Sequence, residues 1–242
     1  MADGILFIHA FPLDANMWSV QRRAFAGETR VVAVNLPGFG GAANAGDLMT
    51  MDTAADRASA AARRAGISKA MVCGLSMGGY VALALWRRHP GLVAGFVFAN
   101  TKAGADDEAG KERRRQLSTR LRAEGNSFLV ESPPPLLSDG APSELWDSVK
   151  KTISQQPAAS IAAASLGMAD RPDSTPDLAG ITVPTLVITG SKDTLIPPEA
   201  TKPMAEGVNG ARYEVIEGAG HLSNLEAPDR FNALLKEHFA RS

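Results

Sequence analysis

The chain has 242 residues, of which 45% are hydrophobic, so it is long enough to bury a sizeable core. Its 25 basic and 26 acidic residues leave a net charge of −1, which gives no overall field to attract nucleic acid or an anionic membrane. The single cysteine excludes a disulfide framework and a Cys-based zinc site. No apolar run approaches the roughly 18 residues of a membrane span, and the first residues lack the features of a signal peptide. We therefore expect a globular, cytoplasmic protein.

Short apolar runs alternate with helical patterns along most of the chain. Most of these runs are continuously apolar, as expected for strands that are covered on both faces. The alternation predicts a doubly wound, mostly parallel α/β sheet of about six strands with right-handed crossovers. The predicted strands are 4–8, 30–34, 70–74, 94–99, 184–188 and 212–216, and the predicted helices between and after them are about 52–65, 77–89, 198–206 and 228–240.

Residues 101–177 interrupt this alternation, because they contain helical patterns and no convincing strand. A structureless loop of that length is improbable inside a compact domain. We therefore predict one domain over residues 1–242, with a helical insertion at 101–177 between two strands. The insertion opens with dense charge, from Asp106 to Arg115, which we interpret as a solvated helix face rather than a patch for phosphate or nucleic acid.

A glycine-flanked serine follows the third predicted strand directly, in Gly74-Leu75-Ser76-Met77-Gly78, and a predicted helix begins there. This strand–turn–helix context is the one that a nucleophile elbow requires. Small residues at 74 and 78 let the strand and helix backbones approach closely. A phosphate-binding loop is disfavoured, because no lysine follows and the glycine spacing of a dinucleotide site is absent. Ser76 is therefore the candidate nucleophile.

A serine hydroxyl needs a base, and the base needs a third group to hold it. Of the four histidines, His221 lies in a glycine-rich loop directly after strand 212–216, at the carboxyl edge of the predicted sheet. His9 ends the first strand, and we interpret it as structural. His221 is therefore the candidate base.

The acid of such a site comes between the serine and the histidine in the chain. Asp193 follows strand 184–188 and so belongs at the same sheet edge, whereas Asp170, Asp173 and Asp177 have no strand end to position them. The preceding strand ends in Asn100, which is not an acid. We therefore assign the role of the acid to Asp193.

Taken together, these blocks resemble the α/β-hydrolase superfamily over nearly the whole chain. Within the superfamily, the closest likeness is to small esterases and proteins similar to 3-oxoadipate enol-lactonase. The matching blocks, in order, are His9-Ala10-Phe11-Pro12, Leu36-Pro37-Gly38-Phe39-Gly40, the Ser76 elbow, Gly190-Ser191-Lys192-Asp193 and Gly218-Ala219-Gly220-His221. The first predicted strand starts almost at the amino terminus, so the two leading strands that the family usually has are expected to be missing.

The resemblance implies a serine hydrolase that cleaves a carboxylic ester or lactone through an acyl-enzyme on Ser76. It implies that the backbone N–H groups of Phe11 and Met77 form the oxyanion hole, and that residues 101–177 roof the site as a cap. No metal or organic cofactor is implied. The expected partner is a small-molecule ester or lactone, with no nucleic acid and no membrane.

Other chemistry remains open at this stage. Thioesterases, carbon–carbon bond hydrolases and perhydrolases use the same three residues, and a ligand-binding receptor on the same fold is a further alternative. Trp18, Trp146, Leu195 and Leu222 are candidates for the substrate pocket, together with the side chain of Phe11. The sequence indicates neither the natural substrate nor the oligomeric state.

Overall fold

The computed structural model describes residues 1–44 and 46–240. Six strands of the described chain form one sheet in the order β2-β1-β3-β4-β5-β6, and every neighbouring pair is parallel. The sheet confirms the predicted fold class, with strand bounds that differ from the prediction by at most two residues. The strands are β1 (Gly4–Ile8), β2 (Arg30–Val34), β3 (Ala70–Leu75), β4 (Val93–Ala99), β5 (Thr185–Gly190) and β6 (Arg212–Ile216).

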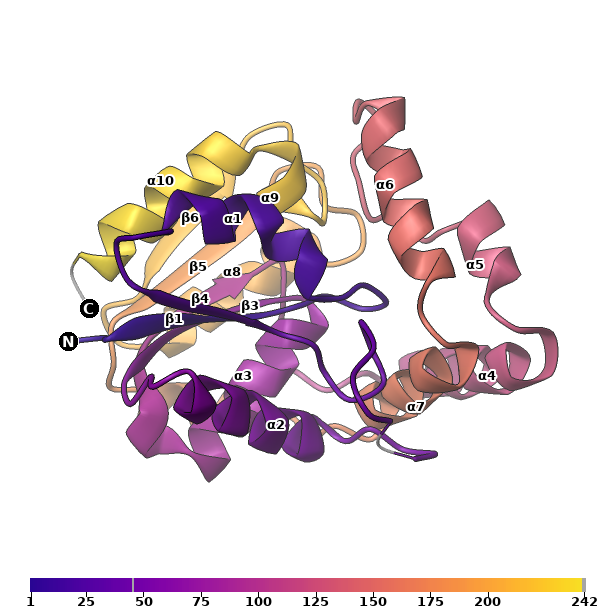
Figure 1. Ribbon diagram of the computed structural model, residues 1–242, viewed down its shortest axis with the longest axis horizontal. Coiled ribbons are helices and arrows are strands. Elements are labelled where there is room, and N and C mark those ends of the chain that lie inside the picture. Colours follow the sequence, from indigo (N-terminus) through magenta and orange to yellow (C-terminus); the bar gives the residue numbers. More distant parts are fainter. Residues whose placement is uncertain (45, 241–242) are drawn as a thin grey trace.

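Helices cover both faces of the sheet (Figure 1). On one face α2 (Met51–Arg64) packs against α3 (Met77–Arg88), and on the other α1 (Ser19–Ala24) packs against α10 (Pro228–Phe239). Helix α8 (Pro198–Gly207) packs against β5. Three short elements complete this part of the fold: η1 (Ala15–Trp18), η2 (Pro90–Leu92) and α9 (Ser223–Glu226).

The core lies between the sheet and these helices. Strands β1, β3 and β5 are buried along their whole length, which explains why their sequences are continuously apolar, whereas the edge strands β2 and β6 are partly exposed. Helix α2 buries a stripe made mainly of alanine, so it can approach the sheet closely. Because all six strands run in the same direction, the carboxyl ends of β3, β5 and β6 open onto one edge.

The chain between β4 and β5 leaves the sheet and returns to it through helices. It contains α4 (Glu108–Glu124), α5 (Ser127–Glu131), α6 (Ser143–Ser154), α7 (Ala158–Ala169) and η3 (Thr175–Gly180), and no strand is found in it; all its residues are described. Figure 1 shows α4 to α7 gathered to one side of the sheet. Helix α7 packs against α4 and touches the segment before α2, where a side chain at Gly167 would overlap the backbone of Met49.

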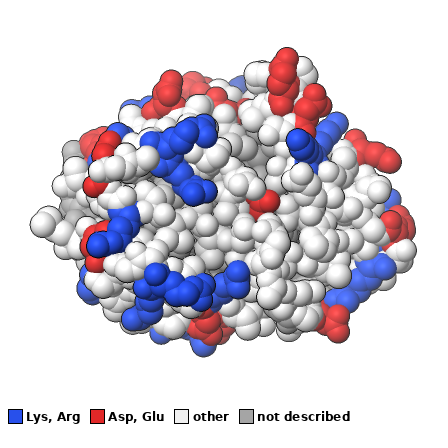
Figure 2. All heavy atoms as spheres, viewed as in Figure 1, with Lys and Arg blue, Asp and Glu red and all other residues white. Residues whose placement is uncertain are grey.

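The surface agrees with the balanced composition. On the face shown in Figure 2, basic and acidic side chains are interspersed around a broad uncharged area. No helix in the described part of the chain is both long and apolar enough to cross a membrane.

Candidate active site

Ser76 occupies the sharp turn between β3 and α3 with φ 55° and ψ −117°, a backbone conformation that is strained for any residue with a side chain. Two hydrogen bonds hold the turn: the Ser76 N–H donates to the Ala99 carbonyl at 3.0 Å, and the Thr101 hydroxyl donates to the Ser76 carbonyl at 2.8 Å. A side chain at Gly74 would overlap the Gly78 carbonyl, and one at Gly78 would overlap the carbonyl of Ile8. The small residues of the motif are therefore required by this close approach.

His221 and Asp193 form a buried pair at the carboxyl ends of β6 and β5. His221 Nδ1 lies 2.8 Å from Asp193 Oδ2, and the two side chains are 2% and 0% exposed. The other carboxylate oxygen, Oδ1, accepts from the backbone N–H groups of Leu195 at 2.9 Å and Ile196 at 3.0 Å. The backbone therefore fixes the position of the Asp193 carboxylate independently of its contact with the imidazole.

Asn100, at the end of β4, supports the same carboxylate. Its amide Nδ2 donates to Asp193 Oδ2 at 2.9 Å and to the Gly220 carbonyl at 3.2 Å, and its Oδ1 accepts from the Ser223 hydroxyl at 2.5 Å. Burial alone would raise the pKa of Asp193, but the hydrogen bonds from His221, Ile196 and Asn100 more than offset it and hold the pKa below its usual value. Asp193 therefore remains an anion beside His221.

A cavity of about 360 Å³ brings Ser76 and His221 together. Phe11 and Leu195 also line it from the sheet side, and the far wall comes from the insertion. Asp193 is not among the residues that line this cavity; it contacts His221 through Oδ2 and the 195–196 backbone through Oδ1. The remaining residues that line the cavity are Tyr80, Lys102, Asp106, Gly110, Arg113, Arg114, Leu117, Pro134, Leu136, Met168 and Ile196.

Phe11 and Met77 stand at the same edge of the sheet. Phe11 follows β1 and lines the cavity, and Met77 is the first residue of α3, so its N–H is one of those that a helix leaves without an intrahelical acceptor. Neither N–H has an acceptor among residues 1–44 and 46–240. Both are thus free to bind an oxygen, and the helix dipole at Met77 favours a negative one. Their role as an oxyanion hole stays a prediction.

Three of the four pocket candidates lie outside the cavity. Trp18 is fully buried in the core, where its ring stacks on Phe7 at 4.8 Å. Leu222 is fully buried, with its N–H bonded to the insertion, and Trp146 lines a separate surface depression with Pro133 and Lys150. Of these four candidates, Leu195 alone lines the cavity; Phe11, the fifth side chain predicted for the pocket, lines it as well. An apolar side chain packs equally well in a core or a pocket, so its identity does not distinguish the two.

The cationic side of the cavity was missed by sequence reasoning. Lys102, Arg113 and Arg114 line it. Arg113 is exposed, as a solvated helix face predicts, whereas Arg114 is partly buried and paired with Asp106, so that interpretation does not hold for Arg114. The sequence contains only part of this signal: Gly110, Arg113, Arg114 and Leu117 have the i, i+3, i+4, i+7 spacing of one helix face, and all four line the cavity, but the spacing alone does not show what that face contacts.

The His221 loop is joined to the insertion by hydrogen bonds. The Leu222 N–H donates to the Leu136 carbonyl at 2.9 Å. The Glu226 carboxylate accepts from the Gly220 N–H at 2.8 Å, and from the N–H (3.1 Å) and hydroxyl (2.5 Å) of Ser138. We call this set of contacts the loop–insertion join. It ties the candidate base to residues 136–138 of the insertion.

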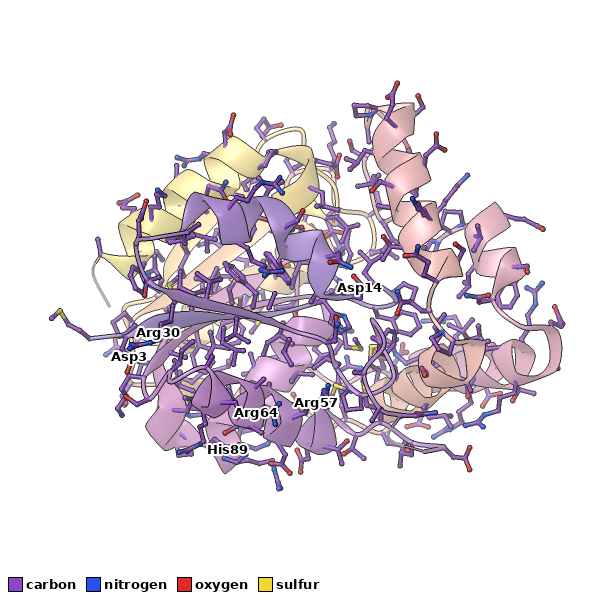
Figure 3. All side chains as sticks on the ribbon, viewed as in Figure 1. Asp3, Asp14, Arg30, Arg57, Arg64 and His89 are labelled. Carbon is purple, nitrogen blue, oxygen red and sulfur yellow. The ribbon has the colours of Figure 1, made fainter. Side chains whose placement is uncertain are left out.

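None of the other three histidines lines the cavity that contains Ser76. His9 is fully buried; its Nε2 accepts from the Leu36 N–H at 3.1 Å, and its Nδ1 lies 2.9 Å from the Ala10 carbonyl. His89 bonds Asp56 at 2.7 Å, and Figure 3 shows it at the side of the molecule away from α6. Figure 3 also shows Asp14 on the side that faces the insertion, where its carboxylate accepts from Gln156 at 3.1 Å. In the described part of the chain, no three or more His, Cys, Asp and Glu side chains gather as metal ligands.

The fold agrees with the comparisons to known proteins. The chain belongs to the alpha/beta hydrolase family, whose model matches residues 5–234. It is an α/β hydrolase with esterase and enol-lactonase relatives. It is 30% identical to 3-oxoadipate enol-lactonase 1 of Acinetobacter baylyi, over 95% of this chain and 86% of that protein.

Two solved structures are also similar. A thermophilic esterase from Thermogutta terrifontis, with malate bound, has a TM-score of 0.95 and 36% identity over 98% of this chain and 89% of its own. The enol-lactonase from Burkholderia xenovorans has a TM-score of 0.89 and 25% identity over 99% of this chain and 92% of its own.

Proposed function

We propose that the protein is a serine hydrolase that cleaves a carboxylic ester or lactone of a small molecule through an acyl-enzyme on Ser76. The observation that supports this most strongly is the arrangement at one cavity: the strained Ser76 and the imidazole of His221 both line it, and Asp193 holds that imidazole from behind at 2.8 Å. The esterase and enol-lactonase relatives point to the same class of substrate.

In the first half of the proposed reaction, the Ser76 hydroxyl attacks the ester carbonyl carbon while His221 Nε2 takes its proton. Asp193 accepts from Nδ1, which fixes the tautomer that leaves Nε2 free as the base and stabilises the imidazolium that forms. The N–H groups of Phe11 and Met77 bind the tetrahedral oxyanion; one such donor is typically worth ~10²–10³ in rate. The tetrahedral intermediate then collapses, the C–O bond to the alcohol breaks, and His221 returns the proton to the leaving oxygen.

In the second half, His221 takes a proton from water as the water oxygen attacks the acyl carbon. The bond to Ser76 Oγ breaks, Oγ regains a proton from His221, and the carboxylic acid leaves. Each step uses only groups of this chain and water. We further propose that the insertion acts as the roof of the site within a single domain, because α4 and the 134–136 segment form the far wall of the cavity.

The proposal is tested by hydrolysis of p-nitrophenyl acetate and butyrate by the wild type, Ser76→Ala and the matched control Ser148→Ala, an exposed serine on α6. We expect Ser76→Ala to lower kcat by at least about a thousandfold, since removing a triad nucleophile has effects of this size or larger, and we expect Ser148→Ala to match the wild type. An initial burst of p-nitrophenol equal to the enzyme concentration would report the acyl-enzyme. Hydrolysis that Ser76→Ala leaves unchanged would refute the assignment, and saturable ligand binding without turnover of any ester would favour a receptor.

A further inference from the structure

Several cationic side chains line the active-site cavity or lie next to it. Lys102, Arg113 and Arg114 line it together with Ser76 and His221. Arg171 stands behind them, with its guanidinium stacked 4.0 Å above the centre of the Tyr80 ring, and Tyr80 itself lines the cavity. Three positive charges therefore line a cavity of about 360 Å³, and a fourth lies behind Tyr80.

Asp106 is the acid in this wall, and three cations share it. Its carboxylate lies 3.2 Å from Lys102 Nζ, 2.5 Å from Arg114 Nε and 2.9 Å from Arg171 Nη2. Burial would raise the pKa of Asp106, but the hydrogen bonds and charges of Arg171 and Arg114 outweigh it and hold the pKa well below its usual range. Asp106 is therefore ionised and cancels one of the four positive charges.

The other acids of α4 are engaged away from the cavity. Glu108 pairs with Lys111 at 2.7 Å, and Glu112 pairs with Arg115 at 3.8 Å. Asp107 caps the helix by accepting from the Gly110 N–H at 2.7 Å. Arg113 has neither an ion pair nor a hydrogen bond within the described chain, although it lines the cavity. The wall thus offers an unpaired guanidinium beside a carboxylate that already serves three cations.

We infer that Arg113, Arg114 and Lys102 form a subsite for a carboxylate carried by the substrate. On this inference, which rests on the proposed function, the substrate class is the half-ester of a dicarboxylic acid. The reacting carbonyl would lie at Ser76 and the free carboxylate at the guanidinium groups, whose planar forks match it in a bidentate manner. Leu117, Leu136 and Met168 supply apolar surface for the aliphatic chain between the two ends.

The test compares monomethyl adipate with methyl hexanoate in a pH-stat, because the two esters share the six-carbon acyl chain and the methanol leaving group and differ in the terminal carboxylate. We expect the wild type to favour the half-ester in kcat/KM by at least about tenfold at low salt, a preference that falls in 0.5 M NaCl because screening weakens charge pairing. Arg113→Gln should reduce this ratio by about tenfold, the effect of losing one charge-assisted hydrogen bond. Arg115→Gln, one residue along the same helix and outside the cavity, should keep the wild-type ratio.

The ratio of the two esters is measured on one preparation, so a loss of folded enzyme cancels. Lys102→Gln provides a second variant should Arg113→Gln fail to fold. The inference is wrong if the wild type shows no preference for the half-ester, or if Arg113→Gln and Lys102→Gln both keep the ratio of Arg115→Gln. Failure of the proposed function gives a different result: Ser76→Ala would then hydrolyse methyl hexanoate as fast as the wild type, or the wild type would hydrolyse neither ester.

Discussion

His9 makes the stability of the fold sensitive to acid. Nε2 accepts from the Leu36 N–H, so the proton of the neutral ring must lie on Nδ1, which donates to the Ala10 carbonyl. A second proton would place an N–H of the ring against the N–H of Leu36. Burial lowers the pKa of His9 from 6.5 to about 4, although the Ala10 carbonyl and Asp14 act in the opposite direction. Protonation of His9 at low pH therefore disfavours the folded conformation of the segment that leads into Phe11.

The size and sign of the effect follow from linkage. Because the unfolded chain binds the proton near pH 6.5 and the folded chain near pH 4, the contribution of His9 to the unfolding free energy is fully present above 6.5 and is lost as the pH falls toward 4. Each pH unit in this window costs about 1.4 kcal/mol. Between pH 7.5 and pH 5, the folded state should lose about 2 kcal/mol through this one residue.

Urea unfolding at pH 7.5 and pH 5 measures the loss in the wild type, His9→Gln and the control His89→Gln. We expect His9→Gln to be less stable than the wild type at neutral pH, since its site is fully buried, but to lose about 2 kcal/mol less on acidification. His89→Gln removes a partly exposed imidazole at the end of α3 and should not reproduce this flattening. Equal losses in the wild type and His9→Gln would refute the assignment of a neutral, buried His9.

Two further predictions concern the contacts that support His221, the proposed base. Asn100→Asp keeps the side-chain shape and tolerates the left-handed backbone (φ 47°), but it replaces the amide that donates to Asp193 with a second acid. In steady-state kinetics we expect kcat to fall about 10- to 100-fold with little change in KM. An unchanged kcat would show that Asn100 does not hold Asp193 in its ionised, hydrogen-bonded state. Glu226→Gln weakens the loop–insertion join and should lower Tm by a few °C in calorimetry, about the effect of 1–2 kcal/mol. The control is Glu217→Gln, because the Glu217 carboxylate accepts a hydrogen bond from Ser191 in a neighbouring loop. An equal drop in Tm in both variants would show that the loop–insertion join contributes no more to stability than this surface contact.

The elements and the meeting of Ser76, Asp193 and His221 were predictable because both depend on local sequence and strand direction. Each residue follows a strand, and parallel strands bring their carboxyl ends to one edge regardless of how the rest of the chain packs. The turn at Ser76 was also predictable from the sequence, because contacts within the motif and with β1 require glycine at 74 and 78.

The far wall of the cavity was not predictable, because it depends on how α4 is seated over the sheet edge. The spacing of Gly110, Arg114 and Leu117 indicates a shared helix face, but not whether that face meets solvent or a cavity. Glu226 and Ser138 are 88 residues apart, and nothing local to either one indicates the other. Trp18 illustrates the same limit, because its ring packs on Phe7 rather than on a substrate.

The loop–insertion join also determines how the specificity of the enzyme can be redesigned. A replacement for the insertion would have to present a carbonyl in the place of Leu136 and an N–H and a hydroxyl in the place of Ser138. Without them, the loop that carries His221 would lose its hydrogen bonds to the insertion. Exchanging the whole segment between β4 and β5 therefore perturbs the loop that carries His221, the proposed base, whereas single changes on the cavity face of α4 leave these contacts in place. Side-chain libraries on α4 are the safer route to new substrates.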